Sequence, residues 1–361
     1  MMNRFTLVKI KSADPFERGL QYGAQAAAQI LGGIENYKRH FLARNLSWEE
    51  IGRRSAQYLP LLERECPAEL TEARGVAQGA GVELGDVMAL NCRYELLKDK
   101  PKECTSASIL TEATGSGKVF LAQNWDYRPW VMDNAVIISI DDCEGTRILG
   151  IAEAGQLVRN GFNSHGVGIC ANNLTSTLDG GEPGIPVTFL RRRVLNSKNF
   201  KEAEKLIYEG KRSVSCNYML ASGEDLAADL ETTPKKVFRL TPESGIVTHA
   251  NHFVAGAEYC TAHDNKFRDK MLRKILLESH GHITKEDIFQ ALSNHETFPG
   301  AADTYPQADC IEALCTHLPK GELDPNGVWQ TIASVVYDLR AGSAYICKGT
   351  PCCGEYVRYD L

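Results

Sequence analysis

The pattern of apolar and polar positions changes near residue 100 and divides the chain into a helical first part and a strand-rich remainder. In the first part, Asp14 before Pro15 is typical of a helix start, because the Asp side chain caps free backbone N–H groups. Ser47 gives the same signal for a second helix. Further helices are expected over 67–78, before a glycine stop, and over 86–97.

Beyond residue 103 short runs of apolar, strand-forming residues alternate with turn residues. Strands are predicted over 104–110, 119–124, 136–140, 146–152, 166–170, 216–221, 226–230, 236–240, 246–250, 330–338 and 343–348. Helices are predicted over 186–195, 200–208, 264–279 and 285–292. This order of elements, with helices first and then antiparallel strands with interspersed helix pairs, favours a layered α+β fold. The charged, proline-containing stretch 98–103 is expected to be a loop.

Composition narrows the class of protein. The 361 residues are 43% hydrophobic and 24% charged, which is ordinary for a globular protein that buries a full core. A net charge of −6 argues against a nucleic-acid partner. No apolar run approaches the roughly 18 residues of a membrane span. Lys9 and Lys11 interrupt the start of the chain, which lacks a secretory signal, so a cytoplasmic location is expected.

The 12 cysteines are scattered, with no Cys-x-x-Cys pair and no zinc-ribbon spacing. Most are therefore expected to be small buried apolar residues and not disulfide partners. His249 and His252 flank Asn251, but a third metal ligand is not evident in the sequence. We therefore expect no metal site.

One predicted hairpin brings reactive groups together. Its turn centres near residues 115–116, which places Cys104 opposite Tyr127, within one residue, and Asp126 beside Cys104. A thiol that begins a strand next to a carboxylate and Asn124 is a candidate reactive site. By itself this signal is weak, because most cysteines beside an aspartate are structural.

The segments around this hairpin resemble a known family. They are Glu103-Cys104-Thr105-Ser106-Ala107, Gln123-Asn124-Trp125-Asp126, the stretch 161–167 and the stretch 249–253. Together they resemble the acyl-coenzyme A:6-aminopenicillanic acid acyltransferase family, also called peptidase family C45. Residues 67–81 and 90–95 are similar to its propeptide region, and 331–340 to its closing segment. The resemblance spans nearly the whole chain, in order.

This resemblance implies a fold and a maturation step. Such N-terminal-nucleophile (Ntn) proteins fold as a four-layer αββα sandwich with two stacked antiparallel sheets. They are made as inactive precursors that cut themselves before a cysteine. Here the cut would fall between Glu103 and Cys104. It would give a helical α chain, 1–103, and a catalytic β chain, 104–361, within one structural domain.

The implied chemistry explains the residue types. Cleavage would free the α-amine of Cys104, which titrates near pH 8 and can take the thiol proton of its own residue. The thiolate is the strong nucleophile, so no catalytic histidine is needed. By resemblance, Asp126 holds the new α-amine and Asn251 donates to the oxyanion. Arg268 resembles a site arginine of the relatives.

Cys104 would then form an acyl thioester and pass the acyl group to water or to an amine. The expected partner is a small acyl amide or acyl thioester, with acyl-coenzyme A as one candidate donor and no cofactor. Arg268, Asn124, Tyr127, Phe162 and His252 are the candidates for substrate binding. The acyl group, the acceptor and the number of copies in an assembly stay open.

Two other functions remain open from the sequence. A papain-like protease would need an activating histidine and a cysteine at the start of a helix, whereas Cys104 begins a strand-like run. A non-catalytic binding protein on the same fold would keep its chain uncut. Loss of activity on replacement of a single histidine would favour the first, and an intact, unreactive chain the second.

Overall fold

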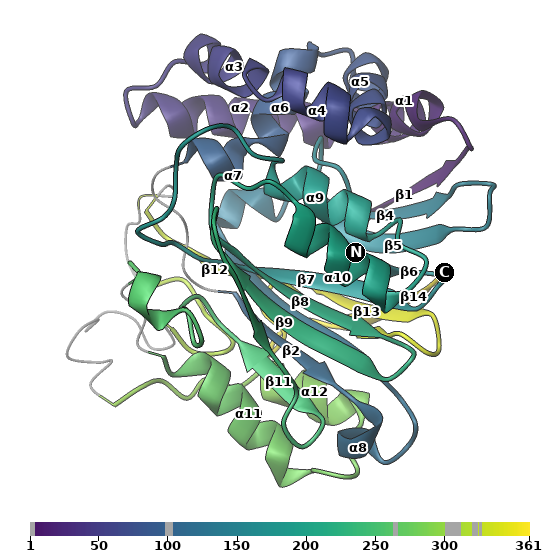
Figure 1. Cartoon of the computed structure of the whole chain (residues 1–361), viewed down its shortest axis with the longest axis vertical. Coiled ribbons are helices and arrows are strands. Elements are labelled where there is room, and N and C mark those ends of the chain that lie inside the picture. Colours follow the sequence, from purple (N-terminus) through teal and green to yellow (C-terminus); the bar gives the residue numbers. More distant parts are fainter. Residues whose placement is uncertain (1–3, 98–103, 263–265, 300–311, 320–323, 325–326) are drawn as a thin grey trace.

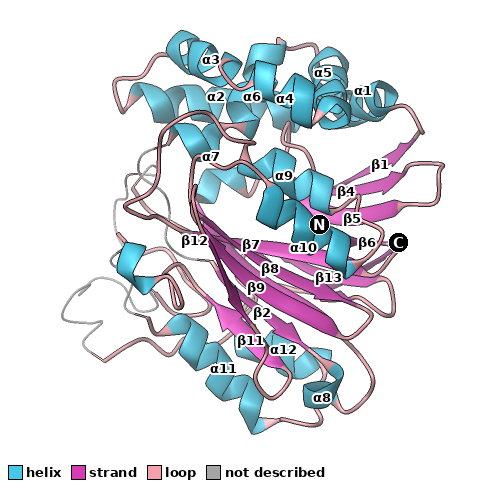
Figure 2. Ribbon diagram, in the orientation of Figure 1, coloured by secondary structure: helices cyan, strands magenta, loops and turns pink. Residues whose placement is uncertain are grey.

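Two β-sheets are stacked face to face between layers of helices (Figures 1 and 2). The computed structural model describes residues 4–97, 104–262, 266–299, 312–319, 324 and 327–361. The predicted loop 98–103, including Glu103, lies outside the described residues. In the described part of the chain, the helices are too short or too polar to cross a membrane.

The first sheet has eight strands in the order β1-β4-β5-β6-β7-β8-β9-β10. Their bounds are β1 Thr6–Lys11, β4 Ala135–Asp141, β5 Arg147–Glu153, β6 Asn160–Asn163, β7 Val167–Asn173, β8 Cys216–Ser222, β9 Leu226–Thr232 and β10 Val237–Leu240. Neighbouring strands are antiparallel except β1 and β4, which pair in parallel. The expectation of purely antiparallel sheets is therefore wrong at this edge.

The second sheet has six strands in the order β11-β2-β3-β12-β13-β14, all antiparallel. Their bounds are β2 Thr105–Ile109, β3 Phe120–Tyr127, β11 Ile246–His249, β12 Gln330–Asp338, β13 Ser343–Lys348 and β14 Tyr356–Asp360. The segment just before β2 carries Cys104, so this sheet positions the candidate nucleophile.

Helices cover the outer face of each sheet (Figure 1). Those over the first sheet are α1 Pro15–Gln25, α2 Ala27–Leu42, α3 Trp48–Ala56, α4 Leu59–Glu65, α5 Pro67–Ala80, α6 Leu84–Asn91, α7 Arg93–Leu96, α9 Val187–Val194 and α10 Phe200–Glu209. Those at the second sheet are α8 Thr111–Thr114, α11 Arg268–Glu278 and α12 Lys285–Leu292. Two short 3₁₀ turns are η1 Pro129–Val131 and η2 Ala257–Tyr259.

Three hydrophobic cores hold the four layers together. The first joins the N-terminal helices and α9–α10 to the first sheet, with Ile30 and Val136 among its members. The second fills the space between the sheets, around Leu121 and Ile137. The third joins the second sheet to α11 and α12. Since side chains of a strand alternate between faces, each sheet serves two cores, and the expected αββα sandwich is confirmed.

The local signals in the sequence act as expected. The carboxylate of Asp14 accepts hydrogen bonds from the backbone N–H of Phe16 at 2.7 Å and of Glu17 at 3.4 Å, at the start of α1. The Ser47 hydroxyl caps α3. Helix α5 ends at Gly81, whose φ of 68° suits glycine. The strands β1, β6 and β14 were not predicted, and β1 places a strand inside the segment expected to be helical.

Candidate active site

Cys104 lies immediately before β2, beside the end of β3. The β2–β3 register pairs Thr105 with Asn124, so the alignment continues from Cys104 towards Trp125 and not towards Tyr127. The predicted register is therefore wrong by two residues, because the connection contains the short helix α8 and is centred earlier than the turn residues suggest. Asp126 is nevertheless adjacent, and its backbone carbonyl lies 3.8 Å from the Cys104 Sγ.

The carbonyl oxygen of Cys104 accepts two side-chain hydrogen bonds. The Asn172 amide donates from 3.0 Å and the Arg268 guanidinium from 3.3 Å. Asn172 is itself oriented by the Ser106 hydroxyl, which donates to its Oδ1 at 2.6 Å. Strands β2 and β7 and helix α11 therefore fix the backbone at Cys104 from three directions.

The Asp126 carboxylate is held from two sides. The Thr331 hydroxyl on β12 donates to its Oδ1 at 2.6 Å, and the Arg268 guanidinium lies 3.8 Å from its Oδ2. Both Asp126 and Arg268 are about 1% exposed. The arrangement keeps a negative charge buried next to Cys104, which is tolerated because a cation accompanies it.

The surroundings make the Cys104 thiol a weak acid. Burial, and then the Asp126 carboxylate, raise the pKa of Cys104 to about 12, and Arg268 and Arg159 only partly oppose this. A protonated thiol is a poor nucleophile, so a group that takes its proton would activate Cys104.

Asn251 is connected to Cys104 through Arg268. The Arg268 Nη2 donates to the Asn251 Oδ1 at 3.1 Å, while the Asn251 amide donates to the backbone carbonyl of Asn173 at 3.0 Å. The structure thus brings together Cys104, Asp126, Asn251 and Arg268, as the sequence predicts. The oxyanion role of Asn251 stays a prediction.

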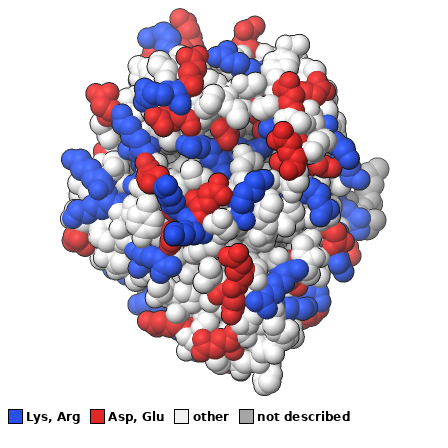
Figure 3. All heavy atoms as spheres, turned by 45° about the vertical axis from the view of Figure 1, so that its right-hand side comes forward, with Lys and Arg blue, Asp and Glu red and all other residues white. Residues whose placement is uncertain are grey.

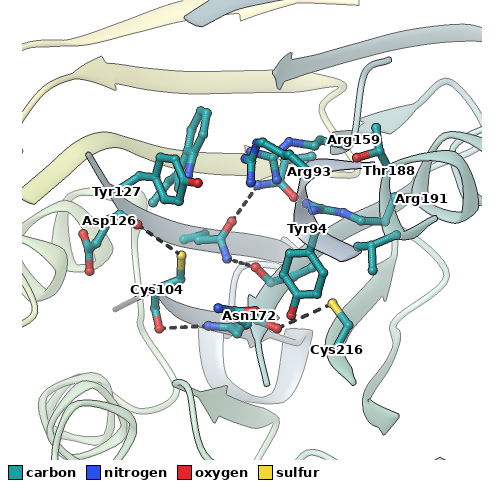
Figure 4. Close-up of a pocket in the computed structure, with 16 residues that line it drawn as sticks. Arg93, Tyr94, Cys104, Asp126, Tyr127, Arg159, Asn172, Thr188, Arg191 and Cys216 are labelled. Carbon is teal, nitrogen blue, oxygen red and sulfur yellow. Dashed lines mark hydrogen bonds between the residues drawn. The ribbon is translucent and has the colours of Figure 1, made fainter. Parts of the chain in front are cut away.

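A pocket opens beside Cys104 and encloses about 620 Å³, including its mouth (Figure 4). Its walls are Arg93, Tyr94, Cys104, Gln123, Trp125, Asp126, Tyr127, Arg159, Asn160, Ala171, Asn172, Asn173, Val187, Thr188, Arg191 and Cys216. The predicted substrate-binding residue Tyr127 is among them.

The other four predicted substrate-binding residues are absent from the pocket lining: Arg268, Asn124, Phe162 and His252. The Asn124 amide faces the opposite side of β3 and donates to the carbonyls of Leu292 and Leu314, at 2.8 and 2.6 Å, because side chains alternate along a strand. Phe162 is buried in the core between the sheets. His252 stacks on His249, with ring centroids 6.1 Å apart. These positions do not support direct contact with substrate.

The pocket is rich in arginine. Figure 4 shows Arg93, Arg159 and Arg191 grouped across the pocket from Cys104. Arg93 and Arg159 both pair with the buried Glu153 carboxylate, and Arg159 lies 3.5 Å from it. Arg93 and Arg159 therefore share one carboxylate. Since Asp126 is the one acidic residue among the described lining residues, the three arginines leave the pocket with an excess of positive charge.

Arg191 has the largest unmet hydrogen-bonding capacity of the three. It is 2% exposed, and its Nε and Nη2 have no hydrogen-bond partner among the described residues. Burial lowers the pKa of Arg191. Burial, and then Arg191 and Arg93, lower the pKa of Arg159 to about 9. Desolvated cations of this kind are stabilised by an anion that enters the pocket.

The sequence does not predict the pocket residues Arg93, Arg159, Arg191 and Asn172 as site residues. Arg191 stands in the run Arg191-Arg192-Arg193 of α9, and because arginine is mostly exposed in folded proteins, the sequence gives no signal that Arg191 is buried. Arg93 lies in one of the segments that carry the family resemblance. On the face of the molecule in Figure 3, acidic and basic side chains are intermixed.

The chain is similar to several known proteins. The 40 kDa form of acyl-coenzyme A:6-aminopenicillanic-acid-acyltransferase from Emericella nidulans is 26% identical over 245 residues, which cover 66% of this chain and 67% of that protein. A variant of conjugated bile acid hydrolase from Clostridium perfringens has a TM-score of 0.46 at 14% identity, covering 72% of this chain and 97% of that one. Penicillin V acylase from Agrobacterium tumefaciens has a TM-score of 0.40 at 13% identity, covering 72% and 86%.

The family match includes Asp126, Asn251, Arg268 and most of the pocket, and begins after Cys104. The sequence model that matches spans residues 113–352, which is well over half of the chain. On this ground the chain belongs to the acyl-coenzyme A:6-aminopenicillanic acid acyl-transferase family.

Proposed function

We propose that this protein is a self-cleaving Ntn enzyme that forms an acyl thioester on Cys104 and transfers the acyl group to water or an amine. The observation that carries the proposal is the position of the Cys104 thiol, in the wall of a pocket and 3.8 Å from the backbone carbonyl of Asp126, whose carboxylate is buried. Family membership supports acyl transfer as the reaction type.

Self-cleavage begins when the Cys104 Sγ attacks the carbonyl carbon of Glu103. The peptide nitrogen leaves as the free α-amine and takes the thiol proton, and a thioester joins the two residues. Water then opens this thioester, releasing the Glu103 carboxylate and restoring the thiol. We expect the Asp126 carboxylate to accept a hydrogen bond from the new α-amine.

Turnover uses the freed α-amine as the base. It takes the thiol proton, the Sγ attacks the acyl carbonyl of the substrate, and the leaving amine or thiol departs with that proton. Water or an acceptor amine then attacks the thioester, gives its proton to the α-amine and regenerates Cys104. The raised pKa of the uncut thiol supports this order, because a base must be created first.

The papain-like alternative fits less well. In the described part of the chain, histidine is absent from the pocket wall. Burial alone lowers the pKa of His249, but Asp229 and Glu231 raise it to about 9, so this imidazole is protonated at neutral pH and cannot act as a base. Its Nε2 lies 3.0 Å from the Glu231 carboxylate.

Intact-mass spectrometry of the purified protein tests the maturation step. We expect two species that correspond to residues 1–103 and 104–361, with iodoacetamide at pH 7.5 modifying the new N-terminal cysteine of the larger one. The uncut chain should label slowly at Cys104 because of its raised pKa. A single full-length mass with an unreactive Cys104 would favour the non-catalytic binding protein.

The arginines favour a substrate that carries a carboxylate, such as an N-acyl amino acid. We expect Arg191→Met to raise KM for an N-acyl amino acid by roughly 10- to 100-fold, since a hydrogen bond to a charged group is lost. The kcat and the KM for the neutral carboxamide analogue should change little.

Arg193→Met on the same helix is the matched control, because Arg193 contacts the Cys66 Sγ at 3.8 Å and lies off the pocket. If Arg191→Met raises KM equally for the N-acyl amino acid and for its neutral carboxamide, the proposed anionic substrate class is contradicted.

A further inference from the structure

Four metal-binding side chains converge outside the pocket. They are His295, Cys315, His317 and Cys352, and their donor atoms all lie within 4.8 Å of one another. The His317 Nε2 lies 3.2 Å from the His295 Nε2, 3.5 Å from the Cys315 Sγ and 3.2 Å from the Cys352 Sγ. These ligands come from three separate segments, so they show no Cys-x-x-Cys or zinc-ribbon spacing in the sequence, and no metal site was expected.

The donor spacing matches one tetrahedral ion. Zinc binds sulfur at roughly 2.3 Å and imidazole nitrogen at roughly 2.0–2.1 Å, so tetrahedral donors lie roughly 3.3–3.8 Å apart. The observed separations of 3.2–3.5 Å around His317 are close to this range. A set of two sulfurs and two nitrogens in this arrangement favours Zn²⁺ among the common divalent ions.

We propose that His295, Cys315, His317 and Cys352 bind a structural zinc ion. Four protein ligands complete the tetrahedron and leave no open position for a reacting water, as in structural sites. The ion would join the segment after α12, the segment 312–319 and the turn after β13. The thiols lose their protons to solvent when they bind the metal.

Hydrogen bonds already hold the central segment in place. The Cys315 N–H donates to the Asn294 carbonyl at 2.9 Å, next to His295. The Thr331 N–H donates to the Thr316 carbonyl at 2.9 Å, and the Thr316 N–H donates to the Thr331 hydroxyl at 3.0 Å. Preorganised ligands of this kind reduce the entropy cost of metal binding.

The same contacts lead to the candidate active site. Thr316 stands between the ligands Cys315 and His317, and the Thr331 hydroxyl that it binds donates to Asp126 at 2.6 Å. A metal that fixes residues 315–317 therefore fixes Thr331, and Thr331 positions the Asp126 carboxylate. This consequence for turnover rests on the proposed function, whereas metal binding does not.

A disulfide is the competing use of the thiols. Cys353 follows Cys352, and their Sγ atoms lie 3.4 Å apart. Cysteine pairing leaves the convergence of two imidazoles unexplained, whereas a metal accounts for all four side chains. Peptide mapping of freshly isolated, unreduced protein separates the two, since a metal site keeps Cys315 and Cys352 as free thiols.

The test is the metal content of the full chain, purified without chelator. We expect about one zinc ion per chain, and visible absorption typical of tetrahedral thiolate-bound Co²⁺ after exchange. Cys315→Ser and His317→Ala should each lose most of the bound metal, whereas the neighbouring control Cys353→Ser should keep it. Removal of the zinc with a chelator should lower the Tm of the wild-type protein.

Metal-free protein with Cys315 and Cys352 reduced, and no Co²⁺ spectrum, would overturn the proposal, as would a Cys315–Cys352 disulfide. If the variants fail to fold, the Co²⁺ spectrum of the wild-type protein still decides. If removal of the metal changes neither self-cleavage nor turnover, the metal site stands, but the proposed effect of the metal on Asp126 is contradicted. Bound zinc in a chain that neither cleaves nor turns over would contradict only the proposed function.

Discussion

Cys104→Ala is expected to abolish both self-cleavage and turnover. The substitution removes the sulfur that would attack Glu103 during maturation and the acyl carbonyl during catalysis, and no second nucleophile replaces it. Intact mass should show one full-length species, and acyl transfer should fall to the background rate. Cys104→Ser should still cleave slowly, because a hydroxyl can undergo the same acyl shift.

Two other cysteines make the test specific. Cys216→Ala removes a second thiol from the same pocket, and Cys143→Ala removes an exposed one. We expect cleavage to persist in both, with normal turnover in Cys143→Ala. Self-cleavage or turnover that survives in Cys104→Ala would contradict the assignment of Cys104 as the nucleophile. Loss of these activities only in Cys216→Ala would contradict it as well.

Asp126→Asn is expected to lower kcat by about 10²-fold, the lower end of the range for a misplaced proton-transfer group. The asparagine can still accept the Thr331 hydroxyl, so the geometry should persist while the charge that holds the α-amine is lost. The measurement is single-turnover acylation of the cleaved enzyme across pH 6–9. The pH at which the rate reaches half its maximum should fall, because a neutral neighbour stabilises the protonated amine less.

The control for Asp126→Asn is Asp338→Asn. Asp338 lies on the adjacent strand β12, is also about 2% exposed and stands near Lys118 at the far end of the strand. Asp338→Asn should lower the stability of the protein at most and should leave kcat unchanged. If both variants reduce kcat equally, the effect is one of folding, and Asp126 has no special role.

The sequence predicts the layered fold well, because its signals are local. Helix caps such as Asp14, and short apolar strands, are determined by residues a few positions apart. Strand β1 was missed because Thr6–Lys11 is half polar and becomes a strand only by pairing with β4, far away in the chain. Tertiary pairing of this kind leaves little trace in a short window.

The sequence predicts only those site residues that lie in or next to the segments that resemble the family. Cys104 and Asp126 lie in segments that resemble the family, and Arg268 follows one of them. Arg159 and Arg191 enter the pocket from β5–β6 and α9, and nothing in their local sequence gives the direction of their side chains. The direction of Asn124 depends on strand alternation, so a residue next to the site in sequence can face away from it in the fold.

The shared core of the N-terminal helices and the first sheet has a consequence for the mature protein. Tyr22 donates to the Gln156 carbonyl at 2.9 Å, Tyr37 to Glu153 at 2.6 Å, and β1 is hydrogen-bonded along the edge of the sheet. A cut before Cys104 would leave all of these contacts in place. The two pieces would unfold in a single cooperative transition, and the larger piece expressed alone would expose an apolar face and precipitate.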